Sequence, residues 1–304
     1  MANRPLAEAI AGHLDIALGQ AALGRFSNGE IRVIINENVR GTDSYVIQPL
    51  CGNANDSLME LLIMIDALRR ASARRITAVI PYYAYARQDR KSRGREPISA
   101  KLVANLLTTA GARRVLTMDL HAPQIQGFFD LPLDHLTGVH ILAEHFRSKG
   151  LDKPMVFSPD AGGVPRAREL AERLGVPLGI LDKRRPEPGV SEVINIIGRA
   201  ANRQIILIDD MIDTGGTIAG GAKALLEAGA EAVYACCTHP VLSGAGPENL
   251  LRSCIAEMVV TDTIPLPEAL RGNPRFTALS VAPLLGEAIV RIHEDLSVSH
   301  LFEI

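Results

Sequence analysis

Short apolar runs alternate with amphipathic segments along most of this chain, and this alternation constrains the fold more than any other feature. Five runs have the length of strands and are apolar at nearly every position: 76–80, 115–118, 155–157, 205–208 and 233–237. Continuous apolar strands are typical of a parallel sheet that helices cover on both faces. The sequence therefore predicts an α/β, doubly wound architecture with mainly parallel sheets.

The segments between these runs have the spacing of helices. Leucine and isoleucine recur three or four residues apart over 58–68, and Ser57 and Glu60 form a capping-box pattern at the expected helix start. Two more helices, over 165–174 and 219–228, are each followed by glycine, the residue preferred just beyond a helix C-terminus. We therefore expect helices between successive strands.

A weak internal repeat points to two similar domains. The tripeptide Ala-Gly-Ala at 110–112 returns at 228–230, and in both copies a valine and a histidine follow at matching positions. A common helix–glycine–strand connection explains this pattern equally well. A length of 304 residues also suits two domains. We expect one domain over 1–146 and a second over 147–304, whose C-terminal tail packs back on the first.

Composition excludes several classes of protein. The chain has 32 Lys and Arg against 34 Asp and Glu, so no overall positive field predicts binding to nucleic acid. No apolar run reaches the ~18 residues of a membrane span, and charged residues stand where a signal peptide would be apolar. The four cysteines lack Cys-x-x-Cys spacing, which favours reduced, mostly buried thiols in a cytoplasmic protein.

Residues 205–217, with the sequence IILIDDMIDTGGT, carry the most specific chemical signal. An apolar strand ends in Asp209 and Asp210, and a Gly/Thr loop then opens a helix. The carboxylates can accept hydrogen bonds from neighbouring sugar hydroxyls, directly or through a metal ion. The backbone N–H groups and hydroxyls of 213–217 can bind phosphate. This combination describes a ribose 5-phosphate site; an ordinary strand–turn–helix cap is the alternative.

The same segment resembles the phosphoribosyl-pyrophosphate-binding signature of phosphoribosyltransferases. The chain further resembles the phosphate-dependent class of ribose-phosphate pyrophosphokinases at 25–30 (RFSNGE), 81–89 (PYYAYARQD), 119–122 (DLHA), 124–129 (QIQGFF), 158–163 (SPDAGG), 182–185 (DKRR) and 238–240 (THP). The resemblance runs from about residue 24 to the C-terminus. It implies two phosphoribosyltransferase-like domains and transfer of the diphosphoryl group of Mg-ATP to the C1 hydroxyl of ribose 5-phosphate. The products would be 5-phosphoribosyl 1-pyrophosphate and AMP.

The resemblance also assigns the two substrates and their partners. For ribose 5-phosphate, it implies a site formed by Asp209, Asp210, Asp213, Thr214, Gly215, Gly216 and Thr217. For ATP, it implies contacts from Arg87, Gln88 and His121. It further implies a homo-oligomer, a hexamer in relatives, because the adenine side would come from a neighbouring subunit's Phe26, Asn28 and Glu30. The chain has no Gly-Lys dipeptide, so a P-loop cannot bind the ATP.

The basic segment 87–95 holds five cations in nine residues after the expected strand 76–80. Its composition alone is typical of a solvated loop, although Arg87 can bind phosphate oxygens. The resemblance gives His121 and Asp160 as ligands of the Mg2+ of Mg-ATP. Magnesium prefers oxygen ligands, which favours Asp160, while His121 can contact a phosphate instead. Without the resemblance, both would be interpreted as core or capping residues.

Four further cations take their roles from the resemblance. Lys183 and Arg185 match the catalytic cations of a flexible loop, although the composition of this run alone is that of a charged surface loop. Many relatives carry a further cation where this chain has Glu187, which changes the charge balance of the loop. Arg40 and Arg95 match positions that contact a regulatory anion, which predicts activation by phosphate.

Two other functions share part of these features. A phosphoribosyltransferase that consumes the product would share 209–217 but would need neither Arg87 and Gln88 nor the second domain. A non-catalytic regulatory relative would have lost the loop cations or the acidic residues, and this chain retains Lys183, Arg185, Asp209, Asp210 and Asp213. The sequence therefore favours the enzyme that forms the pyrophosphate.

Overall fold

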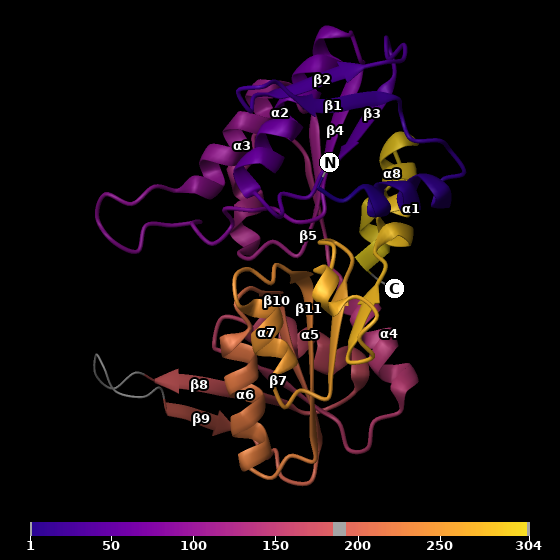
Figure 1. The fold of residues 1–304 in the computed structure, drawn as a ribbon. Coiled ribbons are helices and arrows are strands. Elements are labelled where there is room, and N and C mark those ends of the chain that lie inside the picture. Colours follow the sequence, from indigo (N-terminus) through magenta and orange to yellow (C-terminus); the bar gives the residue numbers. More distant parts are fainter. Residues whose placement is uncertain (1, 185–192, 303–304) are drawn as a thin grey trace. The chain divides into compact units, whose positions relative to one another are not determined.

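The computed structural model describes residues 2–184 and 193–302. The contacts between residues divide the chain into two units, each of which is described by itself (Figure 1). Unit 1 comprises Met1–Thr137 and Ser280–Ile304, and unit 2 comprises Gly138–Leu279. Both units are α/β and their sheets are mainly parallel, which confirms the predicted fold class.

Unit 1 is built on a parallel sheet with the strand order β3-β4-β5-β6. Its strands are β3 (Asp43–Ile47), β4 (Arg75–Ile80), β5 (Arg114–Met118) and β6 (Leu133–Leu136). A separate antiparallel hairpin is formed by β1 (Ala21–Arg25) and β2 (Ile31–Ile35). The helices are α1 (Arg4–His13), α2 (Ala54–Arg70), α3 (Ser99–Ala110) and α8 (Ala282–His293), with 3-10 helices η1 (Pro123–Phe128) and η3 (Val298–Phe302).

Helix α2 begins earlier than the capping-box pattern predicts. Its N-cap is Asn53, whose side chain accepts a hydrogen bond from the backbone N–H of Asp56. Ser57 instead donates its hydroxyl to a carbonyl of the preceding loop, and Glu60 accepts a hydrogen bond from Gln48. The capping-box prediction was wrong because both side chains tie the helix to the preceding segment.

Unit 2 contains a sheet with the order β13-β12-β11-β10-β7-β8-β9, in which β9 runs antiparallel to β8. Its strands are β7 (Met155–Ser158), β8 (Leu178–Arg184), β9 (Val193–Ile197), β10 (Gln204–Ile212), β11 (Ala232–Pro240), β12 (Glu257–Thr261) and β13 (Phe276–Leu279). Its helices are α4 (Val139–Lys149), α5 (Val164–Leu174), α6 (Gly216–Glu227) and α7 (Gly246–Leu251), with the 3-10 helix η2 (Glu268–Leu270).

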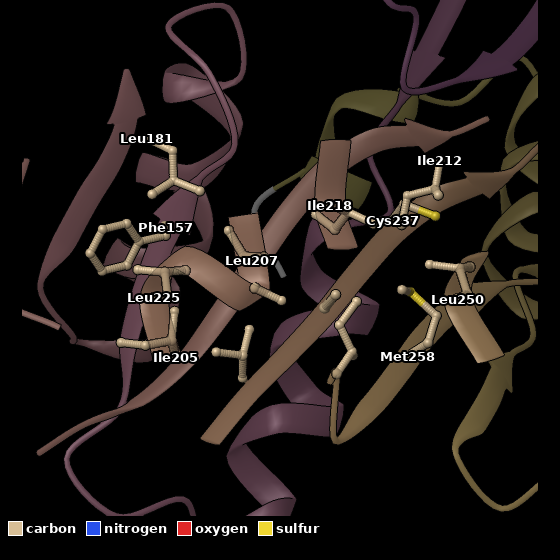
Figure 2. Packing of buried hydrophobic residues seen from close by; sticks show 14 of the residues in the cluster. Phe157, Leu181, Ile205, Leu207, Ile212, Ile218, Leu225, Cys237, Leu250 and Met258 are labelled. Carbon is tan, nitrogen blue, oxygen red and sulfur yellow. The ribbon is translucent and has the colours of Figure 1, made fainter. Parts of the chain in front are cut away.

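Alternate residues of β10 show that helices cover both faces of this sheet. Ile205 and Leu207 belong to a buried cluster with residues of α6 and α7, and Figure 2 shows part of this cluster. Ile206 and Ile208 belong to a second cluster with residues of α4 and α5. Burial on both faces explains why the run 205–208 is apolar at consecutive positions.

The division between the units differs from the predicted boundary. A boundary between residues 146 and 147 would cut α4, yet Leu142, Ala143 and Phe146 of this helix pack in one cluster with α5 and β7. The whole helix therefore belongs to unit 2, and the division falls before it, after Thr137.

The C-terminal segment lies in unit 1, where α8 packs against α1 from the other end of the chain (Figure 1). A Cβ atom on Gly286 would lie 2.5 Å from the ring of His13, so glycine permits this close packing. None of the described helices combines the length and the apolar character that crossing a membrane requires.

The repeated Ala-Gly-Ala sequence has a similar structure in both units. Gly111 is the C-cap of α3 and Gly229 follows Ala228, the C-cap of α6, and both glycines have a positive φ, of 123° and 90°. Strands β5 and β11 follow directly. The two histidines of the repeat differ, because His239 is buried in β11 whereas His121 is exposed.

Candidate active site

The acidic pair, Asp209 and Asp210, belongs to β10, and residues 213–217, which we name the phosphate loop, follow the carboxyl end of this strand. The strand continues through Asp209 and Asp210 to Ile212, so the pair lies within the strand, whereas the sequence predicted it at the end. Helix α6 begins at Gly216, and its N-cap Gly215 has a φ of 72°. No side chain of the described residues caps this helix.

The first N–H groups of this segment are available to a ligand. Among the described residues, none accepts a hydrogen bond from the backbone N–H of Gly215, Gly216 or Thr217. The residues Thr214, Gly216 and Thr217 are also exposed. Unpaired N–H groups at a helix N-terminus are suited to binding a phosphate.

Asp209 and Asp210 are adjacent carboxylates in a largely buried position. Asp210 is 4 % exposed, and its backbone N–H donates to Oδ1 of Asp209 (2.9 Å). Burial, followed by the charge of Asp210, raises the pKa of Asp209 to about 8. Nη1 of Arg166 lies 3.6 Å from Oδ1 of Asp210 and supplies a positive charge beside it. Hydroxyl donors or a cation would stabilise this arrangement.

Arg166 is a site residue that the sequence analysis did not find. It lies in the first turn of α5, and its side chain is 16 % exposed. The helix dipole disfavours a cation in the first turn of a helix. An arginine so soon after the segment SPDAGG was therefore a signal that an acidic partner lies nearby.

Asp160 lies in the turn between β7 and α5. Its Oδ1 accepts a hydrogen bond from the backbone N–H of Gly163 (2.9 Å), and its carbonyl accepts one from the hydroxyl of Ser158 (2.7 Å). Asp160 therefore fixes the turn before α5, whose N-cap is Gly163 and which has no side-chain cap. The residue is exposed, so its carboxylate can reach a ligand as well.

Arg87 and Gln88 lie in the loop after β4, at the carboxyl end of that strand in unit 1. Both residues are exposed. The Gln88 backbone N–H donates to the carbonyl of Tyr85 (3.1 Å), and its side-chain Oε1 accepts from the hydroxyl of Ser99 (2.6 Å). The start of α3 therefore fixes the orientation of Gln88.

A strained turn after β5 presents His121. Asp119 has a φ of 36°, a left-handed conformation that non-glycine residues rarely adopt. The Asp119 N–H donates to the carbonyl of Leu136 (2.9 Å), and the Leu120 N–H donates to Nε2 of His135 (2.8 Å). These bonds fix the backbone just before His121, whose own side chain is exposed.

Phe26, Asn28 and Glu30, which the sequence predicts on the adenine side, lie together at the tip of the β1–β2 hairpin. The Phe26 N–H donates to the carbonyl of Glu30 (2.8 Å), and Oδ1 of Asn28 accepts from the Glu30 N–H (3.2 Å). Phe26 is 52 % exposed, and the guanidinium of Arg32 lies 6.0 Å from its ring centre. An exposed aromatic side chain at a hairpin tip can be covered by another molecule.

Comparison with known proteins places the chain in a family. One family model, the N-terminal domain of ribose phosphate pyrophosphokinase, matches residues 1–111, and another, the phosphoribosyl synthetase-associated domain, matches residues 158–303. The ribose-phosphate pyrophosphokinase of Oceanobacillus iheyensis is 59 % identical over 301 residues, which cover 99 % of this chain and 95 % of the relative. That of Bacillus subtilis is 58 % identical over 300 residues, covering 99 % and 94 %. The chain belongs to the ribose-phosphate pyrophosphokinase family.

A solved structure extends this family likeness to the fold. The crystal structure of phosphoribosylpyrophosphate synthetase from Mycobacterium smegmatis is 47 % identical to this chain, with a TM-score of 0.90. It covers 97 % of this chain and 97 % of its own. The likeness to ribose-phosphate pyrophosphokinases therefore spans both units, which a phosphoribosyltransferase with 209–217 alone would not explain.

The remaining residues expected from the family lie partly outside the described chain. The backbone of Lys183 pairs with Ile194 in the β8–β9 ribbon, which Figure 1 shows at one edge of unit 2. Arg185 and Glu187 lie outside the described residues. Arg40 and Arg95 are both exposed in loops of unit 1. The roles of these residues stay predictions.

A cavity of about 380 Å³ lies elsewhere in unit 1, among α1, the β1–β2 hairpin and β3. None of the candidate residues lines it. All four cysteines are free, and Cys254 is the exposed one. The described residues contain no group of three or more His, Cys, Asp or Glu that could hold a metal ion.

Proposed function

We propose that this chain transfers the β,γ-diphosphoryl group of Mg-ATP to the C1 hydroxyl of ribose 5-phosphate, which it binds through residues 209–217. The reaction is the one for which the family is named. The observation that carries the residue roles is an acidic pair, half-buried Asp209 and buried Asp210, in the same segment as a helix N-terminus without a side-chain cap. The carboxylates accept hydrogen bonds from the sugar hydroxyls, and the loop N–H groups donate to the 5-phosphate.

Residues of unit 1 bind ATP in this proposal. Arg87 supplies charge to the phosphates, and Gln88 and His121 add polar contacts. Phe26, Asn28 and Glu30 of a neighbouring subunit contact the adenine, so the active form is a homo-oligomer, and the family resemblance implies a hexamer. Exposed apolar side chains at Ile98 and along α3, Leu102 and Leu106, support self-association, because they recur every four residues.

Magnesium accompanies ATP, and the donor set of this chain fits it. Magnesium usually takes one or two carboxylates and completes its shell with water and substrate phosphates, so a cluster of three protein ligands is not required. Asp160 is the carboxylate that we propose as its ligand, with His121 as the second candidate. When bound, the ion would neutralise charge on the phosphate oxygens.

Positively charged side chains assist the diphosphoryl transfer itself. The C1 hydroxyl attacks the β-phosphorus in line with the departing AMP, and catalysis depends on positioning and on positive charge. Lys183 and Arg185 supply this positive charge and stabilise the negative charge that develops on the transferring diphosphoryl group. We assign no general base, because a loose transition state leaves little need to deprotonate the hydroxyl early. The free, mostly buried cysteines agree with a cytoplasmic location.

Formation of AMP from ATP and ribose 5-phosphate, with no nucleobase present, tests this function. We expect equal amounts of AMP and 5-phosphoribosyl 1-pyrophosphate, and no AMP when ribose 5-phosphate is omitted. A phosphoribosyltransferase would be inactive until a base and the pyrophosphate were supplied. A non-catalytic relative would be inactive with either set of substrates, and either result would exclude the proposed activity.

Replacement of Asp210 by alanine is expected to weaken binding of ribose 5-phosphate. The change removes an acceptor for a sugar hydroxyl, at a cost of roughly 1–3 kcal/mol, so the KM should rise at least about fivefold. Steady-state kinetics with ribose 5-phosphate as the varied substrate measure this effect. Asp152→Ala, at an exposed position in the same unit, is the matched control and should leave the KM unchanged. An unchanged KM in the Asp210 variant would remove the hydroxyl-binding role.

Inorganic phosphate is expected to activate the enzyme through Arg40 and Arg95. Local arginines can attract an anion even though the net charge of the chain is −2. Initial rates in a phosphate-free buffer should therefore rise on adding phosphate, and ADP should inhibit partly by competing for the same site. Arg40→Ala should need more phosphate for half-activation, with Arg4→Ala as the exposed control. Full activity without phosphate would contradict this proposal.

A further inference from the structure

We propose that Asn249 is a positioning residue for ribose 5-phosphate, because it holds the phosphate loop in the conformation that turns its N–H groups toward the ligand. This inference rests on the proposed function of residues 213–217. Asn249 lies in α7, a short helix that belongs to none of the motifs of the sequence analysis.

The hydrogen bond from Asn249 fixes one peptide plane of the loop. Its Nδ2 donates to the carbonyl oxygen of Thr214 (2.8 Å). That carbonyl shares a planar trans peptide unit with the N–H of Gly215, so the two groups point in opposite directions. Holding the carbonyl toward α7 therefore turns the Gly215 N–H away from α7. This N–H is one of the three for which no described residue is an acceptor.

Other residues of the segment 242–250 pack closely against the phosphate loop and help to hold its conformation. A Cβ atom on Gly246 would lie 2.6 Å from the carbonyl oxygen of Asp213, and one on Gly215 would lie 3.2 Å from Leu250. Leu250 belongs to the buried cluster that also contains Ile212 and Ile218, on the two sides of the loop (Figure 2). The loop therefore packs tightly against Gly246 and Leu250 of α7.

A second hydrogen bond from this segment acts on the loop's own carboxylate. The hydroxyl of Ser243 donates to Oδ1 of Asp213. The backbone N–H of Leu242 also donates to the carbonyl of Ile212 (3.0 Å). Ser243 therefore fixes the position of the Asp213 carboxylate within the phosphate loop, which binds a dianionic phosphate in the proposed function. Hydrogen bonds from the segment 242–250 thus hold Ile212, at the end of β10, and Asp213 and Thr214 of the phosphate loop.

Asn249→Leu, which has a similar size but no donor, tests the inference. Loss of the bond that orients the peptide between Thr214 and Gly215 should raise the KM for ribose 5-phosphate by about 5–30-fold, because the Gly215 N–H is no longer held toward the ligand. The KM for ATP and the kcat at saturating ribose 5-phosphate should change less than twofold. A merely structural role would lower kcat per mole of protein or the melting temperature and leave the KM unchanged.

Two further variants keep the test decisive. Asn36→Leu, at an exposed position of unit 1, makes the same change of side chain away from the loop and should behave as wild type. Ser243→Ala, also at an exposed position, should raise the same KM about threefold or more even if Asn249→Leu folds poorly. Wild-type KM values in both loop variants, in an enzyme that does form AMP, would overturn the positioning role. Absence of AMP formation by the wild-type protein would instead contradict the proposed function itself.

Discussion

Replacement of Lys183 by alanine is expected to lower kcat by at least about a hundredfold. The proposed role of this side chain is to stabilise negative charge that develops on the transferring diphosphoryl group, and a comparable cation is worth about 10³–10⁵ in rate in other phosphoryl transfers. Interactions made mainly in the transition state change turnover more than substrate affinity. The KM values for ATP and ribose 5-phosphate should therefore change less than about tenfold.

The controls separate a catalytic lysine from a structural one. Lys223→Ala removes an exposed lysine of the same unit, on α6, and should leave kcat unchanged. Lys183→Arg keeps the charge and should retain more activity than Lys183→Ala. The melting temperature of Lys183→Ala should equal that of wild type within about 1 °C. A variant that unfolded, or one that turned over normally, would contradict the catalytic role.

Replacement of Asp209 by asparagine is expected to have opposite effects on substrate binding and on stability. Asparagine keeps the Oδ1 that accepts the Asp210 N–H, so the local backbone should be preserved. Loss of the carboxylate should raise the KM for ribose 5-phosphate at least about tenfold, because hydrogen bonds to charged groups are the stronger ones. The free energy of unfolding should nevertheless increase.

The pH dependence of that increase follows from the raised pKa of Asp209, about 8 in the folded chain. Between pH 4 and 8, the folded protein binds a proton that the unfolded chain releases, so this carboxyl makes the wild type less stable as pH rises. Asp209→Asn removes the effect. Its melting temperature should exceed that of wild type by a margin that grows from pH 5 to pH 8, reaching at least about 2 °C.

Thermal unfolding at several pH values, in the absence of substrate, measures this margin. Asp152→Asn, at an exposed aspartate of the same unit, should show no such pH-dependent difference. A constant difference between Asp209→Asn and wild type across the pH range would show that Asp209 is ionised throughout. That outcome would contradict a raised pKa of Asp209 in the folded chain.

The parts of the fold that the sequence predicted correctly are those with a continuous apolar signal. Strands β4, β5, β7, β10 and β11 are buried on both faces, so their own residues identify them. Strand β12 escaped prediction because it begins with a buried Glu257, which breaks the apolar pattern. The carboxylate is paired with Lys149 (2.6 Å) and accepts a hydrogen bond from Thr277 (2.7 Å). Both partners are distant in sequence, so the pattern alone could not reveal them.

The β1–β2 hairpin was missed although its turn carried a signal. Gly29 has a φ of 91°, and its N–H donates to the carbonyl of Phe26 (2.9 Å), so the turn uses glycine at a left-handed position, as longer hairpin loops often do. The strands on either side bury only one face in part, so their apolar character is weaker than that of the central strands. Local turn chemistry was a better guide here than hydrophobicity.

In the candidate site too, the residues of one continuous segment were predictable and those contributed by other elements were not. Asp209 to Thr217 were predictable because one continuous segment carries the acidic pair and the loop. Arg166, Ser243 and Asn249 were not, because each reaches that segment from another element of unit 2. Tertiary packing, rather than any local pattern, brings these three side chains to the loop and strand.

Transfer of label from [γ-32P]ATP tests the central claim most directly. The enzyme is incubated with Mg-ATP and ribose 5-phosphate, without a nucleobase, and the labelled products are separated. We expect all transferred label to appear in 5-phosphoribosyl 1-pyrophosphate, matched mole for mole by unlabelled AMP, because the β- and γ-phosphoryl groups move together. Label in a ribose bisphosphate with ADP as the co-product, or in free inorganic phosphate alone, would contradict diphosphoryl transfer.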